Sequence, residues 1–195
     1  MYLTKIITQS GFPSKSLIRD LCSPYEMHRT VRKAFPQDDK ERYLFRLDNQ
    51  IILVQSMTKP DWSFLQADYA ENVQTKQIDF KFKDGQKLKF KLRANPVKCV
   101  HDKNGKSKRL GILDDDNQME WLIKKGEKSG FKILTIRVAG SKMVKIRQPK
   151  KITYVMADFE GVLEITDAIL FQQTVRLGIG SEKSMGNGLL LFATV

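Results

Sequence analysis

Histidine is the side chain best suited to proton transfer near neutral pH, and this chain of 195 residues holds two of them. His28 follows Tyr25 by three residues, in a segment that also carries Arg29 and Arg32. On a helix with about 100° per residue, these four side chains share an arc of about 100°. Acid–base chemistry on a phosphate ester uses such a histidine with cations beside it. A solvated or backbone-bonded histidine is the alternative interpretation of the pattern.

The charge of the chain indicates a polyanionic partner. Thirty-four Lys and Arg against 22 Asp and Glu give a formal net charge of +12. Lys76 to Arg109 holds 12 basic and 3 acidic residues, and Arg137 to Lys151 adds six basic residues and no acidic one. A solvated sheet face explains the alternating spacing of these lysines, but not their single sign. Because the sequence shows no run of ~18 apolar residues and no signal peptide, we expect a cytoplasmic nucleic-acid-binding protein without a membrane partner.

The cysteines and acidic residues give little sign of a metal site. Cys22 and Cys99 lack metal-ligand spacing, and we interpret both as small buried side chains in a reducing compartment. The run Asp114 to Asp116 precedes Lys124 and Lys125, an order that favours the two ends of one helix over metal ligation. We expect no metal and no small-molecule cofactor. The available chemistry is then attack by an RNA 2′-hydroxyl on the adjacent phosphate, with proton transfer supplied by the protein.

The pattern of apolar residues predicts an α+β protein with two tandem ferredoxin-like (RRM-like) βαββαβ domains, residues 1–85 and 86–195. Ser23, Pro24 and Glu26 form a capping box that begins the helix of His28. In the first domain we expect strands at 2–8, 43–47, 51–56 and 73–82, and helices at 14–21, 24–35 and 62–70. In the second we expect strands at 88–100, on both sides of Ala139 and Gly140, at 152–163 and at 189–193, helices at 114–127 and from 166 or 167 to 177, and a mobile loop at 101–109.

Several segments resemble the CasE family. They are Tyr25 to His28 followed by Phe35 and Pro36, the pair Lys76 and Gln77, and the runs at 92–98, 159–163 and 178–189. The resemblance spans nearly the whole chain. It implies two ferredoxin-like domains and the activity of the CRISPR RNA-processing endoribonuclease of the type I-E Cascade complex. Such a protein cuts precursor RNA at the base of a repeat hairpin without a metal, and it retains the guide RNA beside the other Cascade subunits.

The resemblance also implies roles for single residues. His28 matches the catalytic histidine, and Tyr25 matches the tyrosine one helical turn before it. The products would carry a 2′,3′-cyclic phosphate and a 5′-hydroxyl, and whether His28 is the acid or the base stays open. The side chains that we expect to bind the RNA are Arg29, Arg32, Arg93, Lys98, Lys103, Lys106, Lys108, Arg109, Arg137, Lys142, Lys145, Arg147, Lys183 and Ser184.

Other interpretations of the same sequence stay open. A non-catalytic scaffold subunit that binds an RNA hairpin fits the charge and the fold equally well, and duplex DNA binding also fits the charge. The loop from Gly178 to Gly188 has two interpretations as well. It brings backbone amides to a phosphate, or it is a structural connection between a helix and a strand.

Overall fold

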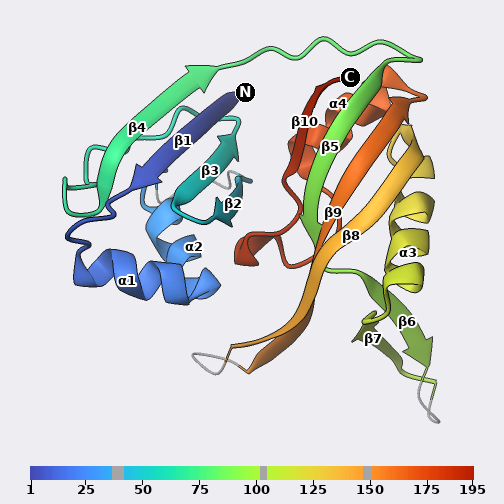
Figure 1. Ribbon diagram of the computed structural model, residues 1–195, viewed down its shortest axis with the longest axis horizontal. Helices are drawn as coiled ribbons and strands as arrows, with labels where there is room; N and C mark the ends of the chain where they lie inside the picture. Colours follow the sequence, from blue (N-terminus) through green and yellow to red (C-terminus); the bar gives the residue numbers. More distant parts are fainter. Residues whose placement is uncertain (37–41, 102–104, 147–150) are drawn as a thin grey trace.

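The computed structural model describes residues 1–36, 42–101, 105–146 and 151–195. The described residues form two four-stranded antiparallel sheets that lie side by side, each accompanied by two helices (Figure 1). We call the part from β1 to β4 the N-terminal unit and the part from β5 onward the C-terminal unit. The elements of the N-terminal unit are β1 (Tyr2–Thr8), α1 (Lys15–Cys22), α2 (Pro24–Arg32), β2 (Leu44–Asp48), β3 (Ile51–Ser56) and β4 (Ala70–Gln77).

The C-terminal unit has the same strand order but places one helix after its first strand and one after its third, and it adds a hairpin and a short helical turn. Its elements are β5 (Lys87–Ala94), β6 (Val97–His101), β7 (Ser107–Gly111), α3 (Asp115–Glu127), β8 (Phe131–Ile146), β9 (Ile152–Ile165), α4 (Ala168–Leu177), the 3-10 turn η1 (Lys183–Met185) and β10 (Leu190–Thr194). The predicted domain boundary between residues 85 and 86 falls in the connection from β4 to β5 and stays a prediction.

The order of the strands confirms the predicted fold class. The two sheets run β2-β3-β1-β4 and β10-β5-β9-β8. In both, the first and third strands of the unit are central, and the fourth strand pairs with the first, which is the ferredoxin-like order. Side chains alternate as predicted on β5, where Leu88, Phe90 and Leu92 are buried while the intervening lysines are exposed. Each sheet therefore buries one face against its own helices.

Two predicted elements are wrong. Residues 62–69 form turns and irregular chain rather than a helix, Ala70 begins β4, and Trp62 is buried in the core of the N-terminal unit. Ala139 and Gly140 lie within β8 rather than at a hairpin turn, because pairing with β9 continues beyond them after a register shift that follows Val138. Such a bulge bends a strand without ending it. The hairpin of this region is instead formed by β8 and β9 themselves.

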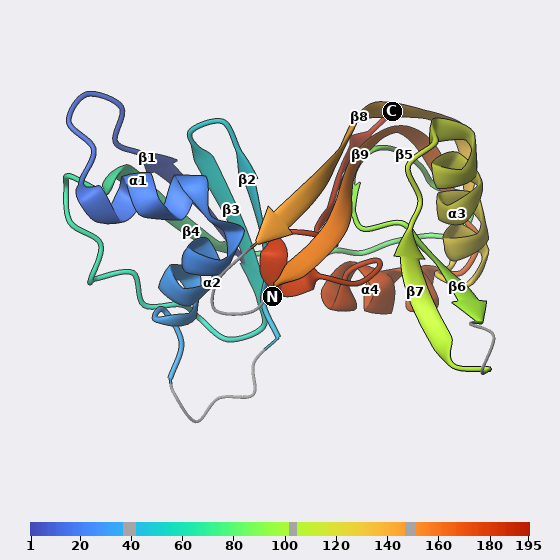
Figure 2. The same cartoon turned by 90° about the horizontal axis from the view of Figure 1, so that it is seen from below.

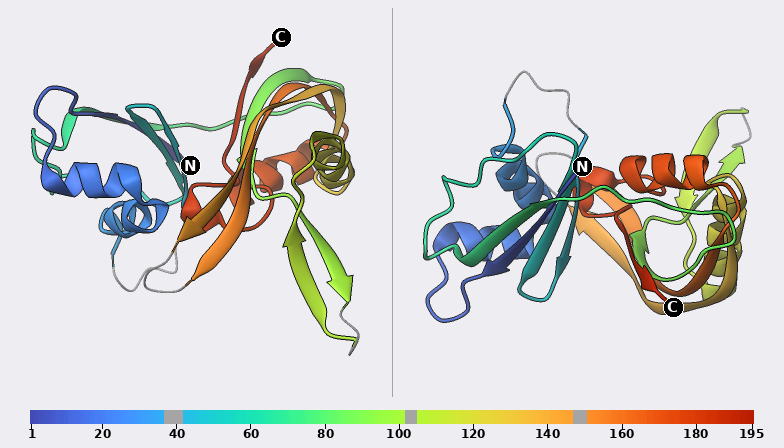
Figure 3. Two further views of the ribbon diagram at one scale, coloured as in Figure 1. Left: turned by 60° about the horizontal axis from the view of Figure 1, so that its bottom comes forward. Right: turned by 90° about the horizontal axis from the view of Figure 1, so that it is seen from above.

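The predicted strand at 88–100 is interrupted at Asn95 and Pro96, so that β5 and β6 are separate strands. β6 pairs with β7 in a two-stranded hairpin that projects from the C-terminal unit (Figure 3). Residues 107–109, which we expected in a loop, are therefore in a strand. The rest of that prediction falls partly on residues 102–104, which lie outside the described residues.

Cys22 and Cys99 are both exposed, so the prediction that they are buried is wrong. Cys22 ends α1 and Cys99 lies on the projecting hairpin. Within the described ranges, no helix is both long and apolar enough to cross a membrane.

The two units are joined by polar contacts as well as by the chain. The buried amide of Gln55 on β3 donates to a backbone carbonyl oxygen of α4 (2.7 Å). Arg46 and Asp48 of β2 meet Arg93 of β5 and Asp158 of β9, with N–O distances of 3.1 Å for Arg46 to Asp158 and for Arg93 to Asp48. We call these four residues the interdomain ion network. It fixes β2 against the sheet of the C-terminal unit.

Candidate active site and RNA interface

The helix that carries His28 begins as the sequence predicts. The Ser23 hydroxyl accepts the backbone N–H of Glu26 (3.4 Å), and Pro24 occupies the first helical position. Met27 and Val31 are buried against the sheet, so His28 is left half-buried at the edge of the core. The amphipathic pattern therefore sets which way α2 faces.

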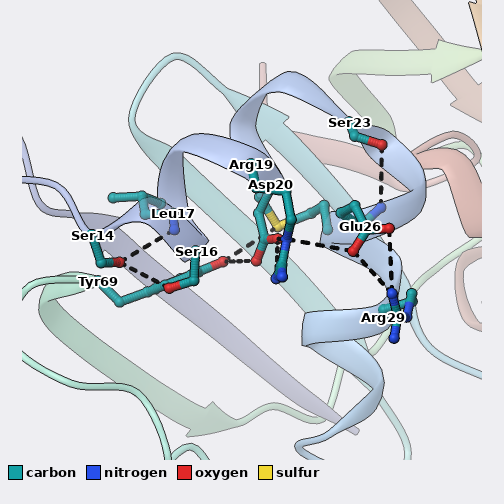
Figure 4. A network of polar contacts seen from close by, with 10 residues as sticks. Ser14, Ser16, Leu17, Arg19, Asp20, Ser23, Glu26, Arg29 and Tyr69 are labelled. Atoms are coloured by element: carbon teal, nitrogen blue, oxygen red, sulfur yellow. Dashed lines mark hydrogen bonds and ion pairs between the residues drawn. The ribbon is translucent and has the colours of Figure 1, made fainter.

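A chain of polar contacts ties α2 to α1 on the outer side (Figure 4). Arg29 contacts Glu26 at 3.1 Å, Glu26 contacts Arg19 at 3.4 Å, and Arg19 contacts Asp20 at 2.8 Å. The Tyr69 hydroxyl donates to the buried carboxylate of Asp20 (2.8 Å). The exposed pairs add little stability, but the buried bond fixes the junction of the two helices. Arg29, predicted to bind RNA, is exposed and lies at the outer end of this chain.

The His28 ring lies in a partly apolar setting. Its ring stacks on Tyr43 (centroids 5.4 Å apart) and lies 6.4 Å from the ring of Phe45. The hydroxyl oxygen of Tyr43 is 2.9 Å from Nδ1 of His28. Burial lowers the pKa of His28, and the charge of Arg32 lowers it further. The imidazole is therefore neutral near pH 7 and is able to accept a proton.

Tyr25 is positioned by the C-terminal unit. It packs against a small cluster built from the far ends of β8 and β9 and from η1, in which Ile146, Tyr154, Met156 and Met185 are buried. These strand ends extend toward α2 (Figure 2). The two residues predicted to be catalytic thus share α2, but they rest on different neighbours: His28 on its own unit, and Tyr25 on the other.

The glycine-rich loop after α4 lies against the same helix, because η1 packs on α2 and β2. Gly186 ends η1 with φ of +80°, and a Cβ there would lie 3.2 Å from the Phe45 ring. Within the loop, Lys183 is half-buried and Ser184 is exposed. Burial lowers the pKa of Lys183, and the nearby charges of Arg42 and Lys125 lower it further. Several cations therefore gather at this junction of the two units.

The remaining predicted RNA-binding residues are spread over the C-terminal unit. Arg93 donates to Asp158, Asp48 and a backbone carbonyl oxygen, so it joins the two units. Arg137 is exposed and pairs with Glu160 at 2.6 Å. Six more of the predicted residues are exposed on the β6–β7 hairpin and on β8, namely Lys98, Lys106, Lys108, Arg109, Lys142 and Lys145. Lys103 and Arg147 lie outside the described residues.

The structure thus brings Tyr25, His28 and Arg32 together on α2 and brings Lys183 to the turn that packs against it. It does not bring Arg137 to this site, because that side chain lies on the sheet surface beside Lys89 and Lys91. Sequence reasoning missed Tyr43, which we had taken only as the start of a strand. Its position eleven residues after the end of α2 carried no signal for contact with His28.

Two ferredoxin-like sheets, strands with exposed cations and one shielded histidine define the class of tandem ferredoxin-like nucleic-acid-binding proteins. The sequence matches the family described as CRISPR associated protein over residues 1–194. It is 34% identical over 215 residues to the CRISPR-associated endoribonuclease Cse3 of Thermus thermophilus, covering 99% of this chain and 100% of that protein. It is 30% identical over 209 residues to the CRISPR system Cascade subunit CasE of Escherichia coli, covering 99% of both.

Solved structures agree with these sequence matches. Thermus thermophilus Cse3 bound to an RNA representing a pre-cleavage complex superposes with a TM-score of 0.88 and 34% identity, covering 98% of both chains. The CRISPR-associated protein Cas6e of Escherichia coli gives a TM-score of 0.67 with 29% identity over the whole of both chains. This chain belongs to the CasE family of CRISPR-associated proteins. The resemblance drawn from the sequence is confirmed.

Proposed function

We propose that this protein is a metal-independent endoribonuclease that cuts CRISPR precursor RNA at the base of the repeat hairpin. The observation that carries the proposal is the half-buried imidazole of His28, whose pKa burial lowers and which shares α2 with Tyr25 and with the cation Arg32. The activity agrees with that of its relatives, among them the CRISPR-associated endoribonuclease Cse3. Among the described residues, no three His, Cys, Asp or Glu side chains gather into a metal-binding group.

In the proposed reaction the 2′-hydroxyl attacks the adjacent phosphate, and His28 exchanges a proton with one of the reacting oxygens. Tyr25 orients the attacking hydroxyl. Lys183 or Arg32 stabilises the charge that develops on the phosphorane. The products carry a 2′,3′-cyclic phosphate and a 5′-hydroxyl.

We further propose that exposed cations of the C-terminal unit grip the hairpin stem through its phosphates, since the deep major groove of A-form RNA admits little direct reading of bases. Lys98, Lys108 and Arg109 supply charge from the projecting hairpin, and Lys142 and Lys145 supply it from β8. The guide RNA stays bound beside other Cascade subunits, as expected from the relative named Cascade subunit CasE. The protein would then work in the cytoplasm, with residues 1–85 and 86–195 as its two domains.

Cleavage of a labelled repeat hairpin in EDTA tests this function. We expect the wild type to cut under these conditions, and His28→Ala to lower the single-turnover rate by at least about 10²-fold while RNA affinity is retained. His101→Ala, which removes the chain's other histidine, serves as the matched control and keeps the rate. Phosphatase treatment of the 3′ end identifies the product, because a cyclic phosphate resists it.

The alternatives predict different results in the same experiment. A scaffold subunit leaves the RNA intact while still binding it, and that outcome contradicts the proposal. If the protein binds duplex DNA, a DNA hairpin of the same sequence competes with the labelled RNA hairpin as well as unlabelled RNA does. The affinity would then not depend on the ribose hydroxyls.

A further inference from the structure

A cavity of about 590 Å³ lies between the two units, within the range of about 300–1,000 Å³ that is usual for small-ligand pockets. One side is formed by the end of α1, the start of α2 and β2, and the other by β5, β8, β9 and η1. Pro24 and Met27, which line the cavity, precede and follow Tyr25 on α2. Met156 and Met185 also line it, and both belong to the cluster against which Tyr25 packs. The cavity therefore adjoins the site predicted to be catalytic.

The floor of the cavity is apolar and adaptable. Its thioethers come from Met27, Met156 and Met185, and Phe45 adds an aromatic ring. All four side chains belong to residues that are at most 9% exposed. Unbranched methionine side chains adjust to the shape of a ligand, and their sulfur atoms contact aromatic rings favourably. A flat aromatic group is therefore the kind of ligand that fits this floor.

Four charged residues line the cavity, and three of them are in ion pairs. Arg93 binds Asp158 at 3.0 Å, and Asp20 binds Arg19 at 2.8 Å. The fourth, Lys142, is exposed on β8. A phosphate would be attracted to Lys142 rather than into the cavity, because removing a charge from water without a partner is costly. The interior therefore suits an uncharged group, and the surface beside it suits an anion.

An RNA nucleotide combines these two properties, because its uncharged aromatic base is joined through the ribose to a phosphate. Asn49, exposed in the turn between β2 and β3, offers the cavity a side-chain amide that both donates and accepts hydrogen bonds. Proteins recognise unpaired RNA bases by contact with their faces and by hydrogen bonds to their edges. A scissile phosphate at the base of a hairpin joins a paired nucleotide to an unpaired one. The unpaired nucleotide is therefore the one whose base is available.

We propose that this cavity binds the base of the first unpaired nucleotide on the 3′ side of the cut, and that Lys142 contacts the phosphate that follows this nucleotide. The inference rests on the proposed function and deepens it, because it assigns a site to RNA outside the hairpin. This nucleotide carries the 5′-oxygen that leaves in the reaction. Holding its base fixes the position of that oxygen, which attack by the 2′-hydroxyl from the opposite side of the phosphorus requires.

Deletion of single bases from a labelled repeat hairpin tests the proposal. When the nucleotide 3′ of the cut is abasic, we expect the wild-type single-turnover rate to fall about tenfold, as for the loss of one base contact. An abasic nucleotide on the 5′ side of the stem leaves the rate unchanged. The proposal is overturned if the 3′ abasic nucleotide has no effect, or if only the 5′ one slows cleavage.

Gly140→Leu fills the cavity from β8. Gly140 lines the cavity opposite Asp158 on β9, and a Cβ at this position meets nothing within 4 Å. We expect the variant to cut the intact hairpin about tenfold more slowly than the wild type, with no further loss when the 3′ nucleotide is abasic. Ala139→Leu is the matched control, because Ala139 is exposed on the same strand but does not line the cavity. It keeps both the wild-type rate and the full abasic effect.

Photo-crosslinking locates the base in the wild type without cleavage. The nucleotide 3′ of the cut is replaced by 4-thiouridine, in RNA whose attacking ribose lacks the 2′-hydroxyl and which therefore stays intact. We expect crosslinks to peptides that contain Met156 or Met185. Crosslinks confined to other parts of the protein, or an equal abasic effect in Gly140→Leu and the wild type, overturn the proposal. Failure of the proposed function is recognised separately, because then the wild type leaves a cleavable hairpin intact, whereas the crosslinks do not depend on cleavage.

Discussion

Protonation of His28 is opposed by burial and by the charge of Arg32, and both lower its pKa. The folded protein therefore holds this proton less tightly than the unfolded chain, in which histidine titrates near pH 6.5. Above that pH both states are neutral, and His28 has no effect on the pH dependence of stability. As the pH falls below it, the unfolded chain takes up a proton that the folded protein resists, so stability is lost.

Replacing His28 removes this dependence. We expect the free energy of unfolding of the wild type to decline between about pH 6.5 and pH 5 more steeply than that of His28→Gln, whose side chain does not titrate. Urea denaturation at a series of pH values measures the two slopes. Parallel curves for the two proteins contradict the lowered pKa of His28.

Spacing in the sequence located Tyr25 and His28, because helical phase is a local property that a capped helix expresses directly. It did not locate Tyr43, whose contact with His28 depends on where β2 enters the sheet. The network of Arg93 was hidden for the same reason, since its partners Asp48 and Asp158 are brought together only by packing of the two units. The RNA-binding role assigned to Arg93 stays a prediction.

The elements were predictable where the chain carries strong local signals. Ser23 and Asp167 cap their helices as expected, and Gly178 ends α4 with φ of +73°. The helix predicted at 62–70 failed because Trp62 is buried through the tertiary fold rather than through helical periodicity. The hairpin predicted at Gly140 failed because a bulge and a turn share the same residue preference.

The glycine loop offers a test at the scale of the element. Gly186→Ala places a Cβ in a left-handed backbone conformation and 3.2 Å from the Phe45 ring, whereas Gly85→Ala has a similar φ of +78° with nothing within 4 Å. Both variants should lose about 1 kcal/mol of stability from the backbone alone. Only Gly186→Ala should also slow cleavage, because its loop must move away from β2 and α2. Equal cleavage rates for Gly186→Ala and Gly85→Ala in chemical quench assays would show that the conformation of this loop does not affect cleavage.

At the scale of the whole molecule, the position of α2, which carries the predicted catalytic residues, depends on both units. Tyr25 rests on strand ends of the C-terminal unit, while His28 rests on Tyr43 of the N-terminal unit. The relative position of the two residues is therefore set by the contacts between the units. Asp158 is central to these contacts, since it pairs with Arg46, whose side chain is 7% exposed, and with Arg93, whose side chain is 16% exposed.

Asp158→Asn removes the charge that both guanidinium groups share. Because a shielded cation loses a partner, we expect the free energy of unfolding to fall by about 2 kcal/mol. Glu160→Gln is the matched control on the same strand and face, since Glu160 pairs with the more exposed Lys91 and Arg137. Glu160→Gln should lower the free energy of unfolding by less than about 1 kcal/mol.

The two variants should differ in cleavage as well as in stability. Loosening of β2 against the C-terminal unit by Asp158→Asn shifts His28 relative to Tyr25, which lowers the single-turnover rate at saturating RNA. Glu160→Gln leaves the interdomain ion network intact and keeps that rate. If Asp158→Asn is destabilised but cuts at the wild-type rate, the network stabilises the fold without setting the geometry of the site. Because His28 and Tyr25 contact different units, we expect Asp158→Asn to lower both the free energy of unfolding and the cleavage rate.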